Sequence, residues 1–157
     1  MDSQQASFRL EKGATGFRDR HDPPLRMTRL TMCRTAWYAA ARAARGRVGY
    51  FAEQEDPQSF HSATISDPGG MHVMLFHAYQ PLIAFVAGRR YGYTDEFVEP
   101  PVWSAAFGDF GFVVLGEVQL RSPLAAADVS GLSAAELRQV SYWRPMSLGA
   151  TLFNSWD

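Results

Sequence analysis

The stretch SFHSATISDPGGMHVMLFHAYQPLIAFVAG, residues 59–88, decides the fold of this chain. Short runs rich in apolar and β-branched residues alternate in it with turn residues, and DPGG at 67–70 is a strong turn signal. Such runs between turns predict strands at 59–66, 72–78 and 82–88. Because the connections between these strands are short, we expect neighbouring strands to pair antiparallel.

The segments on either side of this core extend the prediction. Residues 48–53 read as a further strand, and apolar residues recur every three or four positions from Arg26 to Arg45, which predicts a helix that stops at Gly46. The apolar run at 110–120 contains two glycines, which indicate a bend or bulge.

The C-terminal region is predicted to be helical. Ser133 and Glu136 have the spacing of a capping box, and Pro145 bars that helix from continuing. Leucines and aromatic residues from Leu148 to Trp156 then share one face of a final short helix. The fold class is therefore α+β: an antiparallel sheet of about four to six strands, with one helix before it and two short helices after it. We expect all three helices to cover one sheet face.

Composition bounds the class of protein. The chain has 157 residues, of which 46% are hydrophobic and 20% charged, as in a folded domain. Residues 1–25 are predicted to be a polar tail and residues 26–157 a single domain. Cys33 is the only cysteine, which excludes an intrachain disulfide, and we interpret it as a packing residue. No apolar leader or membrane span is predicted, which favours the cytosol, and no motif predicts a cofactor or a metal site.

The charges are unevenly placed. Residues 1–49 hold ten Lys or Arg against four Asp or Glu, whereas the rest holds five against twelve. Four arginines cluster on one arc of the predicted first helix, where they could contact phosphates. Nucleic-acid binding is therefore an alternative function, although a solvated helix face would give the same pattern. The four residues are Arg29, Arg34, Arg42 and Arg45.

Carboxylates and aromatic rings alternate after residue 91. Carboxylates can take a partner's arginines while rings fill its pockets, which predicts a recognition surface for a basic protein. The leading hypothesis is a small non-enzymatic protein-binding module of the immunity or inhibitor type, facing a basic toxin or nuclease; a solvated acidic loop is the simpler interpretation. The predicted partner-binding residues are Asp95, Glu96, Phe97, Glu99, Trp103 and Asp109.

An enzyme of unrecognised type is the third hypothesis. No nucleophile elbow, Walker loop or dinucleotide fingerprint is present, so no catalytic residue is predicted. His72 and His77 are five positions apart and point to opposite faces of a strand, so they cannot chelate one metal from it. His77 lies closest to a chain reversal and would be the first histidine to examine.

The chain from about Leu120 onward resembles the C-termini of a group of uncharacterised bacterial proteins. The resemblance covers about a quarter of the chain and implies only a small bacterial protein, of the kind found beside immunity and defence factors. Its large rings are expected to anchor the two short helices on the sheet. The matching residues are Leu132, Glu136, Leu137, Tyr142, Trp143, Pro145, Gly149, Phe153, Asn154, Trp156 and Asp157.

Overall fold

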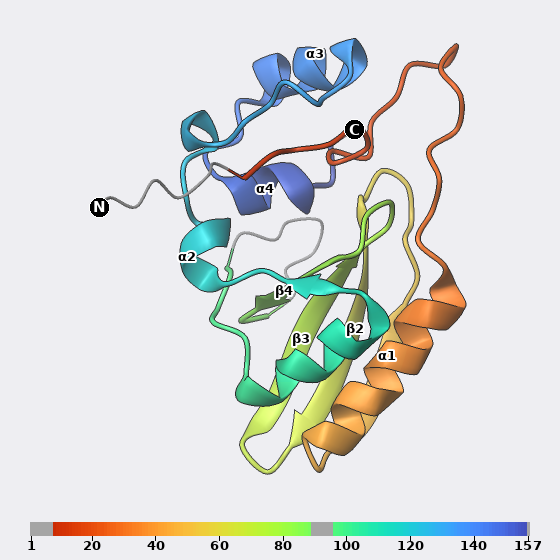
Figure 1. Ribbon diagram of the computed structural model, residues 1–157, viewed down its shortest axis with the longest axis vertical. Helices are drawn as coiled ribbons and strands as arrows, with labels where there is room; N and C mark the ends of the chain where they lie inside the picture. Colours follow the sequence, from red (N-terminus) through yellow and green to blue (C-terminus); the bar gives the residue numbers. More distant parts are fainter. Residues whose placement is uncertain (1–7, 89–95, 157) are drawn as a thin grey trace.

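The computed structural model describes residues 8–88 and 96–156, and it contains a five-stranded sheet in the order β1-β2-β3-β4-β5 (Figure 1). The first four strands pair antiparallel, as predicted, and form an antiparallel meander in which each strand pairs with the next one along the chain. The α+β prediction is confirmed. These strands are β1 (Arg47–Ala52), β2 (Phe60–Asp67), β3 (Gly70–His77) and β4 (Leu82–Val86).

The last strand differs from the prediction. The run at 110–120 gives only a two-residue strand, β5 (Val113–Val114), and this strand pairs parallel to β4. A parallel neighbour requires a long crossover, and the chain makes that crossover between β4 and β5 through the 3₁₀ helix η1 (Val102–Phe110). The rest of the run turns into the short helix α2 (Glu117–Leu120).

One sheet face, called here the α1 face, is covered by α1 (Leu30–Ala43) and η1 (Figure 1). The predicted helix forms, but it begins at Leu30 because Arg29 is already extended. The contacts on this face are mainly apolar and aromatic: Phe107 of η1 meets Phe76 of β3 edge to face, with ring centroids 5.7 Å apart. The Trp37 indole donates to the Thr64 carbonyl at 3.0 Å, beside a bulge in β1.

The opposite face is covered by the C-terminal helices and by the N-terminal segment, so the expectation that all helices share one face is wrong. The capping box is present, because Ser133 and Glu136 each accept from the other's backbone amide. Within the described part of the chain, every helix is too short or too polar to span a lipid bilayer. The remaining elements are η2 (Leu124–Ala126), α3 (Ala134–Trp143) and α4 (Leu148–Leu152).

Part of the segment predicted to be a polar tail is buried in the core, namely Leu10 and residues 13–15, whereas residues 16–25 are partly or fully exposed. Leu10 and Ala14 are fully buried, and the buried carboxylate of Glu136 accepts from the Gly13 and Thr15 amides at 3.0 and 2.9 Å. Periodicity missed this segment because it is held mainly by hydrogen bonds from distant residues, such as those of Glu136 from 121 and 123 positions away, rather than by a helix or strand.

The C-terminal anchor forms with only part of its predicted residues. Phe153 and Asn154 are buried, and the Asn154 side-chain amide donates to the Thr15 carbonyl at 2.9 Å. Tyr142 and Trp143 instead lie on the surface, with 76% and 39% of their area exposed. The C-terminal segment therefore joins the two ends of the chain and also presents an exposed pair of rings.

Candidate functional site

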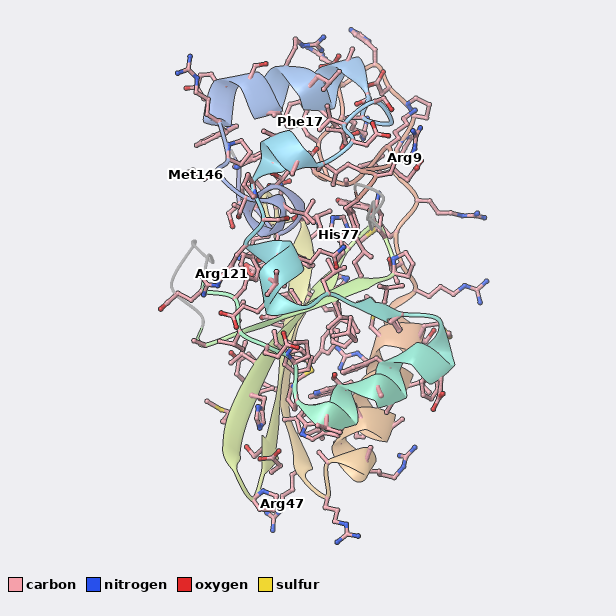
Figure 2. The ribbon with its side chains drawn as sticks, turned by 60° about the vertical axis from the view of Figure 1, so that its left-hand side comes forward. Arg9, Phe17, Arg47, His77, Arg121 and Met146 are labelled. Carbon is pink, nitrogen blue, oxygen red and sulfur yellow. The ribbon has the colours of Figure 1, made fainter. Side chains whose placement is uncertain are left out.

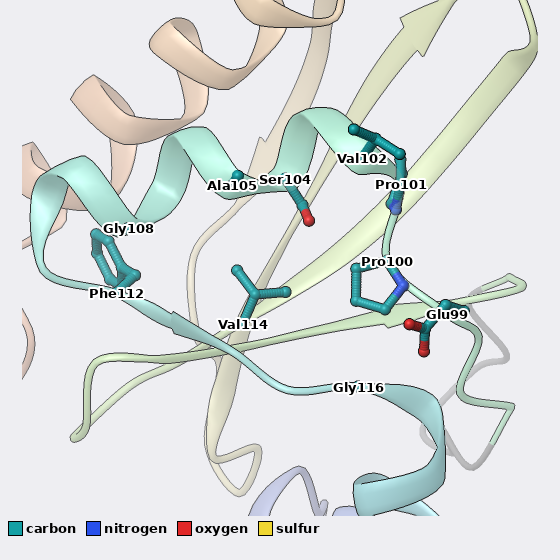
Figure 3. Close-up of a pocket in the computed structure, with 10 residues that line it drawn as sticks. All are labelled: Glu99, Pro100, Pro101, Val102, Ser104, Ala105, Gly108, Phe112, Val114 and Gly116. Atoms are coloured by element: carbon teal, nitrogen blue, oxygen red, sulfur yellow. The ribbon is translucent and has the colours of Figure 1, made fainter.

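One concave feature of the described residues is a groove of about 390 Å³ between η1 and β5 (Figure 3). Its lining is mostly apolar, with Pro100 and Pro101 at one end and Phe112 at the other. Val114 points into it from β5, and Ser104 points into it from η1 (Figure 3). This size and lining are typical of a site that takes one side chain or a short extended segment. The full lining is Glu99, Pro100, Pro101, Val102, Ser104, Ala105, Gly108, Phe112, Val114 and Gly116.

β5 gives the groove an open sheet edge. The amides of Val113 and Leu115 bond to the carbonyls of Pro81 and Ile83, at 2.8 and 2.9 Å. In a parallel pair, the residue between two such residues directs its N–H and C=O away from the neighbouring strand. The backbone groups of Val114 therefore face away from β4, and they have no partner among the described residues. An unpaired edge of this kind can template a further strand.

Ser104 adds a free polar group to the groove. The residue is 7% exposed, and its hydroxyl points into the groove without a hydrogen-bond partner among the described residues (Figure 3). Serine hydroxyls in helices commonly bond back to the preceding turn, which this one does not do. Among the described residues, the fully buried side-chain polar atoms without a partner are His61 Nε2 and Ser62 Oγ; the Ser104 hydroxyl is instead open to solvent, where a ligand's polar group could bond to it.

The groove has acidic residues at both ends of η1. Glu99 lines it at the Pro100 end, where its Oε1 accepts from the Glu117 amide at 3.0 Å and caps α2. Asp109 is exposed directly after Gly108, at the other end of η1. The Glu117 carboxylate is paired with Arg121 at 3.0 Å, and none of the described residues that line the groove is an arginine or a lysine. The groove therefore suits a positively charged ligand.

The other predicted recognition residues do not join this site. Phe97 is 1% exposed and packs against Phe153, so it is a core residue. The Trp103 indole turns inward and donates to the Asp67 carboxylate at 3.0 Å. Glu96 is half-buried and bonded, and Asp95 lies outside the described residues. Of the predicted residues that the structure describes, Glu99 and Asp109 are those at the ends of η1 beside the groove, while Ser104 and Val114 were missed.

The predicted arginine stripe is divided. Arg34 pairs with Glu53 at 3.2 Å and its guanidinium lies 4.4 Å from the Phe51 ring centre, so its charge is already engaged. Arg29 lies at the start of α1, whereas Arg42 and Arg45 are exposed at its other end, about four helical turns away. The four side chains therefore do not form one phosphate-binding face.

The histidines do not converge. His72 bonds to Asp67 at 3.0 Å on the α1 face, whereas His77 is fully buried on the opposite face, as the spacing predicted. Burial lowers the pKa of His77 to about 4, and its Nε2 donates to the Ala14 carbonyl. In residues 8–88 and 96–156, no three His, Cys, Asp or Glu side chains are placed to hold a metal ion. Cys33 is buried, which raises its pKa to about 12.

Comparisons with known proteins found no relative of this chain. No protein family matches the chain, no curated protein matches its sequence, and no solved structure matches its fold. The interpretation of the groove therefore rests on this chain alone.

Proposed function

We propose that this protein is a non-enzymatic protein-binding module that takes an extended, basic segment of a partner protein into the groove between η1 and β5. The observation that carries the proposal is the coincidence of two free polar features in one groove, namely the outward backbone groups of Val114 and the partly enclosed hydroxyl of Ser104. A partner strand laid beside β5 would pair with Val114, as in binding by β-strand addition.

The carboxylates of Glu99 and Asp109 favour a basic partner, such as the toxin or nuclease that an immunity protein would bind. An arginine or lysine on the bound segment would reach Glu99 or Asp109, and acidic groups at both ends of the site would also speed the encounter with a cationic protein. Alternate side chains of the segment would face the apolar wall made by Pro101, Val102 and Ala105.

The same groove gives less support to catalysis. A serine nucleophile needs a base within hydrogen-bond reach, and among the described residues none contacts the Ser104 hydroxyl. Glu99, the one carboxylate in the lining, already accepts a backbone hydrogen bond from Glu117. These contacts favour recognition over acid–base chemistry.

A pair of seven-residue peptides tests the proposal. One peptide alternates arginine with valine and the other alternates glutamate with valine, each carrying a fluorophore for anisotropy measurements. We expect the basic peptide to bind and the acidic peptide to fail. Ala105→Arg should abolish binding, because it places bulk and positive charge in the groove at an exposed position that the fold does not need. Equal binding of the two peptides would refute the proposal.

Two further measurements locate the bound peptide. The double variant Glu99→Lys and Asp109→Lys should weaken binding about tenfold or more, whereas Glu55→Lys, an exposed change near the β1 edge of the sheet, should leave it unchanged. Hydrogen exchange at the Val114 amide should slow in the complex, because strand addition would protect it. An exchange rate at Val114 that stays unchanged under saturating peptide would rule out strand addition at β5.

A further inference from the structure

A second surface lies at the end of the molecule opposite α3, where α1 ends and β1 begins; Arg47 marks it in Figure 2. Arg42, Arg45 and Arg47 are exposed there, and none has a carboxylate partner among the described residues. Three arginines elsewhere in the molecule differ from them in having a carboxylate partner. Arg9, Arg121 and Arg138 pair with Glu11, Glu117 and Asp19.

The local backbone brings these three arginines together. Arg42 and Arg45 are three positions apart at the end of the helix, and Arg45 has a φ of 54°, in the left-handed region that ends helices. Gly46 then passes so close to the Ser66 carbonyl that a Cβ would lie 2.2 Å from the oxygen. The chain reverses direction at this close approach, and β1 begins at Arg47. Three exposed arginines therefore lie within six residues of the chain.

The nearest carboxylates do not neutralise this cluster. Glu53 lies beyond the other end of β1, where it is paired with Arg34. Asp67 follows Ser66, the strand partner of Arg47, but it accepts hydrogen bonds from His72, Trp103 and the Gly69 amide. Burial alone would raise the pKa of Asp67, but these hydrogen bonds outweigh it and hold the pKa below its usual range. Asp67 is therefore ionised, yet among the described residues it is paired with His72 and not with any of the three arginines, whose guanidinium groups have no direct ion pair.

An aromatic ring adjoins the cluster. Tyr38 is one helical turn before Arg42, and half of its surface is exposed. One side of its ring is supported by Trp37, with centroids 5.3 Å apart. Exposed rings beside arginines are the combination that binds single-stranded nucleic acid, because bases stack on the ring while guanidinium groups take the phosphates.

We propose that this surface, formed by Tyr38, Arg42, Arg45 and Arg47, binds single-stranded nucleic acid. Three phosphates lie against the three arginines, and one base stacks on the free side of Tyr38. Sequence preference is weak, because neither a guanidinium–phosphate contact nor a stacked ring reads base edges. The surface is separate from the groove between η1 and β5, so the two sites function independently.

Anisotropy with a labelled twelve-nucleotide single strand tests the proposal. We expect binding that weakens with salt, with a slope of log affinity against log salt of about −2 for three released counterions. The triple variant Arg42→Gln, Arg45→Gln, Arg47→Gln should lose this slope, and the corresponding triple lysine variant should largely retain it. Because Arg42 also faces the negative end of the α1 dipole, thermal unfolding of both variants is measured alongside.

Tyr38 distinguishes single strands from other polyanions. Tyr38→Ala should weaken single-strand binding about fivefold or more while leaving a duplex of the same length unaffected, and Tyr38→Phe should retain binding. Ala105→Arg, which blocks the groove, should leave oligonucleotide binding intact. The proposal is overturned if the glutamine variant folds and binds as well as the natural chain, if Tyr38→Ala weakens both nucleic acids equally, or if only vesicles containing phosphatidylserine are bound.

Discussion

The two faces of the sheet are held by different kinds of interaction. On the α1 face, rings and small apolar side chains pack together, as in the contacts of Phe107 with Phe76 and Phe85. On the opposite face, a buried polar network joins the N-terminal segment, α3 and the C-terminus. The first kind of packing depends on volume and tolerates exchange, whereas the second depends on the position of individual donors and acceptors.

Glu136 is at the centre of the polar network, between residues that are far apart in the sequence. One carboxylate oxygen accepts from the Gly13 and Ser133 amides, and the other accepts from the Thr15 amide and hydroxyl. His77 and Asn154 bind the same segment from the other side, through the Ala14 and Thr15 carbonyls (Figure 2 labels His77). The segment around Thr15 is therefore fixed by three side chains that lie 62 or more positions away.

Removing the Glu136 carboxylate should give the largest loss of stability. Glu136→Leu leaves two buried backbone amides and one part-buried amide without an acceptor, so we expect a loss on the order of 5 kcal/mol in the free energy of unfolding. Glu136→Gln should lose about half as much, because its NH₂ group must face at least one of these amides. Urea denaturation followed by tryptophan fluorescence measures both; a loss below about 1 kcal/mol for the leucine variant would contradict the central role of Glu136.

His77 gives the polar face a pH dependence. Its folded pKa of about 4 lies below the ordinary value of 6.5, because burial disfavours the charged ring more than the Ala14 carbonyl and Glu136 favour it. The unfolded chain therefore binds the proton first as the pH falls. The contribution of neutral His77 to the free energy of unfolding should be fully present above pH 6.5 and should decline as the pH falls from 6.5 to 4. Below pH 4, His77 should cause no further change. The full decline is roughly 3 kcal/mol.

A variant separates His77 from the carboxylates that also titrate in acid. His77→Gln should be less stable than the natural chain at pH 7.5, because the Tyr79 and Gln80 amides lose the Nδ1 acceptor. The stability difference should narrow as the pH falls to 4, since glutamine does not titrate. Denaturation curves at several pH values check this expectation, and a difference that stays constant would mean that His77 does not titrate as described.

The sequence predicted the features that depend on local pattern. Four strands, α1 and the Ser133 capping box were all predicted within a few residues, because periodicity, turn residues and cap spacing determine them. The helix η1 was missed, although Pro101 before it and Gly111 after it, with a φ of 87°, are ordinary start and stop signals. The helix was missed because its own sequence is short and strongly apolar and lacks the periodicity of an α-helix.

Of the candidate site, the sequence indicated only the two acidic residues, because charge can be read directly from the amino-acid type. Glu99 and Asp109 were named from composition, but the free edge of Val114 depends on β5 returning parallel to β4, which no local pattern specifies. Phe97 and Trp103 were assigned to the surface because an aromatic residue in a polar loop looks the same in sequence whether it packs inward or outward. Arg34 and Arg42 likewise look equivalent until Glu53 is placed beside only one of them.

The smallest loss of stability is expected for a conservative substitution on the α1 face, which can be compared with Glu136→Gln on the opposite face. Phe107 is fully buried between Phe76 and Phe85, yet Phe107→Leu should cost less than about 1.5 kcal/mol, because a similar apolar volume leaves no polar group without a partner. Phe107→Ala, which leaves a cavity, should cost about 3 kcal/mol and serves as the control that the position is packed. Measured in the same urea series, Phe107→Leu should fall well below Glu136→Gln, although each substitution nearly preserves size. If the two conservative substitutions cost the same, the two faces are not held together differently, and the polar network contributes no more than ordinary packing.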